Sequence, residues 1–347
     1  MYTSKTRSYD IDLELHEGQR WAEVIKHEVG PARRLAKQAL ADISATVDDA
    51  APSWVPGWLK GTVVKTAGKA LEQAYKLAGG RYVDEMKAWA EALKVSTADA
   101  VLLNCTYELS GMCTVGAVNS DTLGMVHVRT LDWPLSAIGA ATRLFRFHRG
   151  DHEFVAVGIV GHVGVLSGMV PGAYSVTINW APPDGRPTFD FGPAFLLREV
   201  LETCTTYNQA VAALKATTLS APVFYFVCGA KPGQACVIER TRDDAAVRKM
   251  KGRTLVHANH HETSKFRHRN DEIDRFDPEA EEMSMLTYSE TRAASLDAGL
   301  TMTIGRKSTV DDVAACLDVD DVCNDDSYQQ MLFVPATGEV KVWRWVG

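Results

Sequence analysis

Two short segments decide the fold of this chain: residues 104–114, which read NCTYELSGMCT, and residues 127–133, which read HVRTLDW. Between them, residues 115–118 and 123–128 are mostly apolar. They flank residues 119–122, which read NSDT and are typical of a turn. Two apolar runs separated by a short polar turn predict a β-hairpin.

Pairing across this hairpin brings three reactive side chains together. If Val118 pairs with Leu123, position 128 lies opposite Cys113, and a shift of one residue places Arg129 there instead. Asp132 follows just past the end of the second strand. The sequence therefore predicts that a thiol, a guanidinium and a carboxylate meet at one end of the hairpin.

This trio suits nucleophilic catalysis. A fixed positive charge beside a thiol favours the thiolate, which is the nucleophilic form. If Cys113 were the first residue of a chain, its α-amino group, with an ordinary pKa of about 8, could take the thiol proton. Asp132 would then orient that amino group. Spacing alone leaves open the alternative of an ordinary hairpin with a surface ion pair between Arg129 and Asp132.

Composition narrows the class of protein. The chain has 347 residues, 46% of them hydrophobic, and a net charge of −7, which argues against a general nucleic-acid binder. No apolar run is long enough for a membrane-spanning helix, and no apolar segment follows residues 1–10, so we expect a cytoplasmic protein without a secretory signal. Seven cysteines, an odd number without any Cys-x-x-Cys pair, predict neither a disulfide framework nor a thiolate zinc site.

The order of predicted elements indicates the α+β class. The N-terminal third predicts a half-buried strand and then helices, at residues 8–15, 17–35, 36–47, 54–77, 82–93 and 96–103. From residue 113 onward strands predominate, at residues 114–118, 124–130, 154–159, 175–179, 223–228, 235–239, 254–258, 330–334 and 340–345. Three helices interrupt them, at residues 195–203, 209–215 and 308–317. The highly charged residues 260–285 are expected to lie on the surface. Helices packed on sheets follow from this pattern.

The motifs resemble a known family, the N-terminal nucleophile hydrolases that include acid ceramidase and N-acylethanolamine acid amidase, relatives of the choloylglycine hydrolases. That family has an Asn-x-x-Tyr-Glu run, a Cys-Thr-Ser nucleophile and an Arg-Asn-Leu-Asp motif. This chain has matching runs at residues 104–108, 113–115 and 129–132, with Val115 in place of the serine and Thr130 in place of the asparagine. Further similarity lies at residues 11–13, 20–21, 168–172, 174–179, 221–227 and 255–259.

The resemblance implies a fold and an activity. The fold would be a four-layer αββα sandwich with a largely helical N-terminal chain. Self-cleavage between Met112 and Cys113 would give a small chain, residues 1–112, and a catalytic chain, residues 113–347, which stay associated. The enzyme would hydrolyse linear amides of hydrophobic N-acyl substrates, such as N-acylethanolamines or ceramides, through a thioester on the Cys113 thiol. No cofactor is implied.

The resemblance also assigns roles to further residues. Arg129 and Asp132 would act beside the thiol and the amino group, and Asn259 would donate to the oxyanion of the tetrahedral intermediate. Asn179 matches a second polar residue near the nucleophile, and Arg292 a late arginine of the family. An acyltransferase or penicillin-type acylase, which also uses an acyl-cysteine, is the main alternative. A protein that binds an amphiphile and has lost catalysis is another.

Three other patterns have competing explanations. His257 and His261 are four residues apart, which would suit a metal site on a helix, but residues 254–258 predict a strand. Residues 164–168, GVLSG, resemble a nucleophile elbow with the serine one place late, and a glycine-rich turn explains them better. Trp54 and Trp58 belong either to a core-facing helix or to a surface that contacts membranes; the resemblance to lipid enzymes favours membrane contact.

Overall fold

The computed structural model describes residues 2–50, 69, 72–73, 80–105, 111–182, 191–274 and 283–346. Two β-sheets dominate it. A six-stranded sheet contains, in spatial order, β1 (Tyr2–Thr3), β14 (Glu339–Trp345), β13 (Ser327–Val334), β4 (Gly124–Asp132), β3 (Met112–Ser120) and β12 (Thr254–His257). An eight-stranded sheet contains β11 (Ala245–Lys249), β10 (Ala235–Arg240), β9 (Val223–Gly229), β8 (Tyr174–Trp180), β7 (Ser167–Val170), β6 (His152–Ile159), β5 (Thr142–Arg149) and β2 (Ser8–Asp12).

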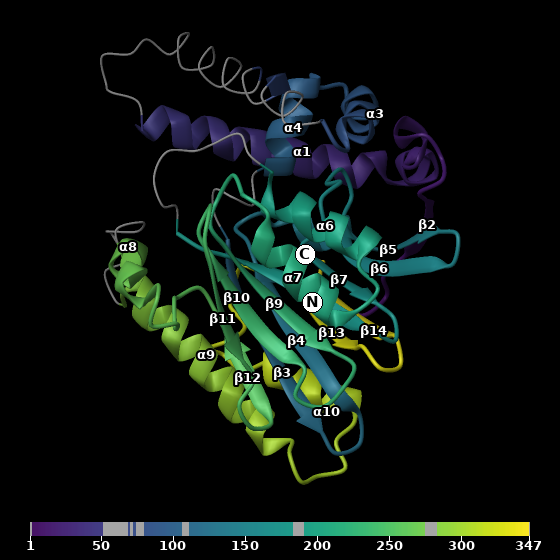
Figure 1. The fold of residues 1–347 in the computed structure, drawn as a ribbon. Helices are drawn as coiled ribbons and strands as arrows, with labels where there is room; N and C mark the ends of the chain where they lie inside the picture. The colour runs from purple at the N-terminus through teal and green to yellow at the C-terminus, as the bar shows by residue number, and fades with distance from the viewer. Residues whose placement is uncertain are drawn as a thin grey trace.

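The two sheets pack face to face, and helices cover their outer faces (Figure 1). β3 and β4 lie against β8 and β9 across the interface. Helix α9 (Met285–Met302) packs on β3 and β12, whereas α6 (Pro193–Thr203) and α7 (Tyr207–Ala216) pack on the eight-stranded sheet. Shorter elements complete this part: α5 (Ala137–Ala141), η3 (Arg267–Asn270), α8 (Asp271–Asp274), α10 (Val310–Ala314) and η4 (Ala315–Leu317). The layers therefore follow the order αββα.

Side chains of β3 alternate between the two faces of the six-stranded sheet, as the pleat of a strand requires. Cys113, Val115 and Ala117 face the eight-stranded sheet, and Val118 packs in the cluster beneath α9. Gly116 lies on the helix side, where a Cβ atom would come within 2.7 Å of Leu300 Cδ1. The absence of a side chain at Gly116 therefore lets α9 approach the strand closely.

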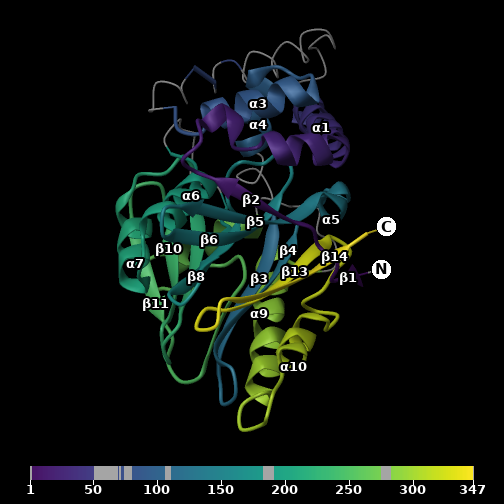
Figure 2. The ribbon, with the colours of Figure 1, turned by 90° about the vertical axis from the view of Figure 1, so that its right-hand side faces the viewer.

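The N-terminal segment forms a helical layer across one end of the sheets (Figure 2). It contains η1 (Glu17–Gln19), α1 (Ala22–Ala50), α3 (Val83–Leu93) and α4 (Thr97–Cys105). Its first two strands extend both sheets, since β1 pairs with β14 and β2 pairs in parallel with β5. The segment is thus tied to both halves of the sandwich.

Two buried carboxylates also fasten the N-terminal segment to the sheets. Glu85 of α3 binds Arg198 of α6 through both oxygens, at 2.5 and 2.7 Å, and both side chains are fully buried. Glu28 of α1 accepts from Arg143 Nε at 2.8 Å and from Tyr9 Oη at 2.6 Å. Breaking a buried pair of this kind is costly, because it leaves a charge without a partner.

Most of the predicted elements within the described residues are confirmed, with two kinds of difference. The strands β1, β5, β7 and β11 and the helices α5 and α9 were not expected; β5 carries three arginines among its eight residues, which weaken its apolar pattern. The stretch 260–285 was expected on the surface, but its described part at residues 260–274 is only partly exposed, and His260 and His261 are buried. The buried carboxylate of Glu239 accepts from His261 Nδ1 and from two backbone N–H groups, and His260 Nδ1 lies 2.8 Å from Ser289 Oγ. The helix expected over residues 54–77 lies outside the described residues, apart from 69 and 72–73.

A buried histidine makes stability depend on pH. His127 lies between the sheets, bonded to Ser175 Oγ at 2.8 Å and Thr177 Oγ1 at 3.2 Å, and burial lowers its pKa to about 3. A histidine whose folded pKa lies below its unfolded value of about 6.5 destabilises the fold as pH drops through the interval between them. At pH 5 this one residue should cost about 2 kcal/mol relative to pH 7.

Urea unfolding at pH 7 and pH 5 measures this effect. His127→Gln keeps polar atoms near both hydroxyls but does not titrate, so its free energy of unfolding should change by about 2 kcal/mol less between the two pH values. An equal pH dependence in both proteins would show that His127 is not the group responsible.

Candidate active site

The register of the central hairpin differs from the sequence prediction by three residues. Cys113 pairs with Leu131, and Val115 pairs with Arg129. The difference arises at the turn, where Gly124 adopts a φ of +74° and pairs with Ser120, so β4 begins later than expected. Arg129 still reaches the thiol, because its long side chain shares the inner face of the sheet with Cys113.

The Arg129 guanidinium is buried and held at several points. Its Nη2 donates to Cys113 Sγ at 3.0 Å and to the Ile178 carbonyl, while its Nη1 donates to the Leu166 carbonyl at 2.9 Å and to Ser167 Oγ. These bonds fix a permanent positive charge against the sulfur. Negative charge that develops on Sγ is stabilised there, and the low local dielectric strengthens the effect.

Two asparagines from distant segments hydrogen-bond the backbone of Cys113. Asn259, just past β12, accepts from the Cys113 N–H through Oδ1 at 3.0 Å, and its Nδ2 donates to the Trp180 carbonyl at 2.7 Å. Asn179 of β8 donates through Nδ2 to the Cys113 carbonyl at 3.3 Å and to the Ala258 carbonyl at 2.9 Å. An amide nitrogen carries two donors, so Asn259 retains one N–H beyond its bond to Trp180.

Asp132 and Arg292 lie on the opposite face of the same strand ends. Arg292, from α9, donates to Thr114 Oγ1 at 2.9 Å and to Asn259 Oδ1 at 2.9 Å, and its Nη1 lies 3.5 Å from Asp132 Oδ2. Asp132 accepts from Ser327 Oγ at 2.5 Å. Burial raises the pKa of Asp132, and the guanidinium of Arg292 opposes that rise.

The structure thus gathers all six predicted residues, Cys113, Arg129, Asp132, Asn179, Asn259 and Arg292, at one buried end of the six-stranded sheet. One expected contact is absent from the intact chain: the Cys113 nitrogen bonds Asn259 rather than Asp132. The orientation of a Cys113 amino group by Asp132 therefore stays a prediction for a cleaved chain.

Sequence reasoning missed three serines of the site. Ser167 holds Arg129, Ser327 donates to Asp132, and Ser289 accepts from the Asn259 backbone N–H at 2.8 Å. Only Ser167 lies in a recognisable pattern, the GVLSG run that resembles a nucleophile elbow. It is buried in β7 rather than exposed on a turn. Ser289 and Ser327 come from distant segments that carry no local motif.

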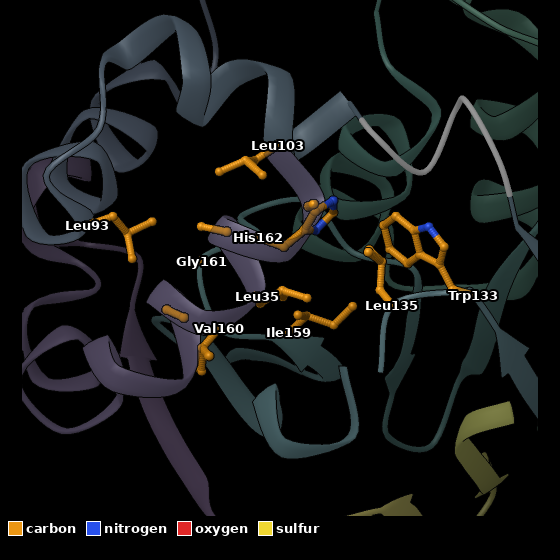
Figure 3. A pocket seen from close by; sticks show the side chains of 12 residues that line it. Leu35, Leu93, Leu103, Trp133, Leu135, Ile159, Val160, Gly161 and His162 are labelled. Atoms are coloured by element: carbon orange, nitrogen blue, oxygen red, sulfur yellow. The ribbon is translucent and has the colours of Figure 1, made fainter. Parts of the chain in front are cut away.

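An apolar cavity lies beneath the helical layer (Figure 3). It is lined by α1, α3, α4 and the β6–β7 connection, with these residues: Ala32, Leu35, Ala36, Ala39, Leu93, Leu103, Trp133, Leu135, Ile159, Val160, Gly161 and His162. Figure 3 shows Trp133 and Leu135 on one side, and Leu93 on the other. Leu131, the strand partner of Cys113, is two residues before Trp133 in the sequence, and Trp133 lines the cavity.

The described part of the chain contains neither a candidate metal site nor a membrane-spanning helix. No group of three or more His, Cys, Asp or Glu side chains there is placed to hold a metal ion. No helix within those ranges has the length and apolar character needed to cross a bilayer. The membrane contact expected at Trp54 and Trp58 lies outside the described residues.

Comparison with known proteins shows what this chain resembles. A family model described as acyl-coenzyme A:6-aminopenicillanic acid acyl-transferase matches residues 125–294. N-acylethanolamine-hydrolyzing acid amidase of Mus musculus is 28% identical over 249 residues, covering 69% of this chain and 65% of that protein. Acid ceramidase of Heterocephalus glaber is 27% identical over 267 residues, covering 68% and 64%. The chain is similar in sequence to these two enzymes over about two thirds of its length.

A solved structure supports the fold. The Caenorhabditis elegans ortholog of N-acylethanolamine-hydrolyzing acid amidase superposes with a TM-score of 0.53 and 22% identity, covering 67% of this chain and all of that one. The αββα arrangement of the N-terminal nucleophile hydrolases, expected from the sequence, is therefore confirmed. The chain spans just under two thirds of the length of the curated relatives it matches.

Proposed function

We propose that this chain is a cysteine N-terminal nucleophile amidohydrolase that cleaves linear amide bonds of hydrophobic N-acyl substrates. The observation that carries the proposal is the 3.0 Å contact between Arg129 Nη2 and Cys113 Sγ, in a site where asparagines bind the nitrogen and the carbonyl of the same cysteine. The homologues are named for hydrolysing N-acylethanolamines and ceramides, which are amides of this kind.

The site must first free the Cys113 amino group. In this step Cys113 Sγ attacks the Met112 carbonyl carbon, and the peptide C–N bond breaks as the acyl group moves to sulfur. Water then hydrolyses the thioester and releases the Met112 carboxylate. The products are residues 1–112 and residues 113–347, the latter beginning with a free amino group.

The freed amino group supplies the base that the thiol lacks. It takes the Sγ proton as sulfur attacks the substrate carbonyl, and the remaining N–H of Asn259 donates to the oxyanion. The C–N bond breaks, the amine leaves with the proton, and an acyl thioester remains on Cys113. Water, deprotonated by the same amino group, releases the fatty acid.

The apolar cavity is the place for the acyl chain. Cys113 pairs with Leu131, and Trp133, which lines the cavity, lies one residue past the end of β4. Its lining is apolar apart from His162, which suits an alkyl chain. No cofactor enters this mechanism.

The proposal also covers the compartment of the enzyme, the association of its two chains after cleavage and its contact with membranes. Burial lowers the pKa of His127 to about 3 and that of His260 to about 4, which favours a near-neutral compartment such as the cytoplasm. The strands β1 and β2, with the buried pair Glu85–Arg198, would keep the two chains associated after cleavage. Peripheral membrane contact through Trp54 and Trp58 is part of the same proposal.

A substrate panel tests the reaction. The purified protein should release dodecanoate from N-dodecanoylethanolamine or N-dodecanoylsphingosine without added metal or cofactor. The match to an acyl-transferase family favours a second candidate, in which the thioester passes to an amine. Supplying dodecanoyl-coenzyme A with 6-aminopenicillanic acid and finding amide product faster than free acid would favour that transferase. Absence of turnover on every substrate would leave only an amphiphile-binding protein.

A further inference from the structure

Asn104, the first residue of the Asn-x-x-Tyr-Glu run, holds a loop from the other half of the molecule. It lies on the last turn of α4 and is almost fully buried. Its Oδ1 accepts from the Val163 N–H at 2.7 Å, and its Nδ2 lies 3.4 Å from the Gly161 carbonyl and donates to the Ala100 carbonyl at 2.9 Å. One side chain therefore binds backbone groups on both sides of His162.

A second group of the N-terminal segment fixes the same loop. The Val163 carbonyl accepts from Arg198 Nη1 at 2.8 Å, and Glu85 of α3 holds that guanidinium through both of its oxygens. Gly161 has a φ of +91°, a conformation that side-chain-bearing residues rarely adopt. The loop thus depends on polar partners rather than on regular strand pairing, and buried backbone groups are costly to leave unpaired.

The loop forms one wall of the apolar cavity. Val160, Gly161 and His162 line it, facing Leu93 and Leu103 of α3 and α4 (Figure 3). The His162 ring is fixed by a 3.1 Å bond from Nδ1 to the Gly164 carbonyl. The bonds made by Asn104 therefore set the position of this wall relative to the helices opposite.

We propose that Asn104 is a specificity-determining positioning residue, which shapes the cavity for long acyl chains by holding residues 161–163. This inference rests on the proposed function, because it takes the cavity as the acyl-chain site. Asn104 lies in residues 1–112, whereas the loop lies in residues 113–347. The preference for long chains therefore requires both products of the cleavage, and the small chain determines substrate choice without touching the thiol.

Calorimetric titration with two fatty-acid anions tests the proposal without catalysis. Wild-type protein should bind dodecanoate, and Asn104→Ala should bind it about tenfold more weakly, since two buried backbone groups lose their partner and the wall shifts. In turnover, the preference for N-dodecanoyl- over N-butanoylethanolamine should fall about tenfold through KM for the long substrate. The butanoyl chain is too short to depend on the whole cavity.

Asp99→Ala is the matched control on the same helix. Asp99 caps α4 by accepting from the Ser96 N–H at 3.0 Å and from Ser96 Oγ at 2.7 Å, so its bonds lie at the start of the helix rather than at the loop. Its loss should lower Tm as Asn104→Ala does, but leave the chain-length preference unchanged. An equal shift in preference for Asp99→Ala, or equal losses on both substrates for Asn104→Ala, would overturn the proposal. So would failure of wild-type protein to bind dodecanoate, whereas dodecanoate binding without amide turnover would contradict only the proposed reaction.

Discussion

The Cys113→Ala protein should remain one intact chain and show no detectable amide hydrolysis. Both reactions need the same sulfur: it attacks the Met112 carbonyl during processing and the substrate carbonyl during turnover. The Cys113 sulfur is the thiol that contacts the Arg129 guanidinium, so its removal takes away the nucleophile of both reactions. Denaturing electrophoresis follows the first reaction, and release of dodecanoate from N-dodecanoylethanolamine follows the second.

Cys323→Ala is the matched control, because Cys323 is half-buried and lies outside the site. It should be processed and turn over at the wild-type rate. Cleavage or turnover in Cys113→Ala would remove this thiol from the mechanism and direct attention to another nucleophile.

Asn259→Asp should lower kcat by roughly 10²–10³ with little change in KM, the usual loss for one oxyanion donor. The substitution keeps an oxygen that can accept from the Cys113 nitrogen and from Arg292 Nη2. It removes both Nδ2 donors, the one bound to the Trp180 carbonyl and the one available to the oxyanion. Steady-state kinetics on processed enzyme measures the effect.

Asn270→Asp is the matched control, which distinguishes a loss of catalysis from a loss of stability. Asn270 is another buried asparagine, which binds the backbone of His261 through both ends of its amide, at 2.7 and 3.0 Å. Its replacement should lower Tm without lowering kcat. If Asn259→Asp keeps kcat within threefold of wild type, Asn259 is not the oxyanion donor.

The central hairpin shows which features local sequence patterns predict correctly and which they do not. Alternation and the turn predicted both strands, yet the register was wrong by three residues because the positive φ of Gly124 moved the turn. The predicted contact between Cys113 and Arg129 is correct despite that error, because the long arginine side chain can reach several positions on the opposite strand. Local sequence thus predicted the reactive pair more reliably than the strand pairing.

The rest of the site depends on tertiary packing. Asn179, Asn259 and Arg292 lie on β8, beside β12 and on α9, and only resemblance to the family indicated them. Nothing in their local sequence shows that these segments meet: the approach of α9 to β3 depends on the bare backbone at Gly116. Ser167, Ser289 and Ser327 were missed for the same reason: the role of a buried hydroxyl depends on a partner that is far away in the sequence.

Mass spectrometry of the enzyme quenched in acid during turnover tests the central claim most directly. The account predicts two chains, residues 1–112 and 113–347, with the dodecanoyl mass on the larger chain and localised to the Cys113 thiol beside a free amino group. The contrary result would be an active, uncleaved protein whose Cys113 nitrogen is still in a peptide bond.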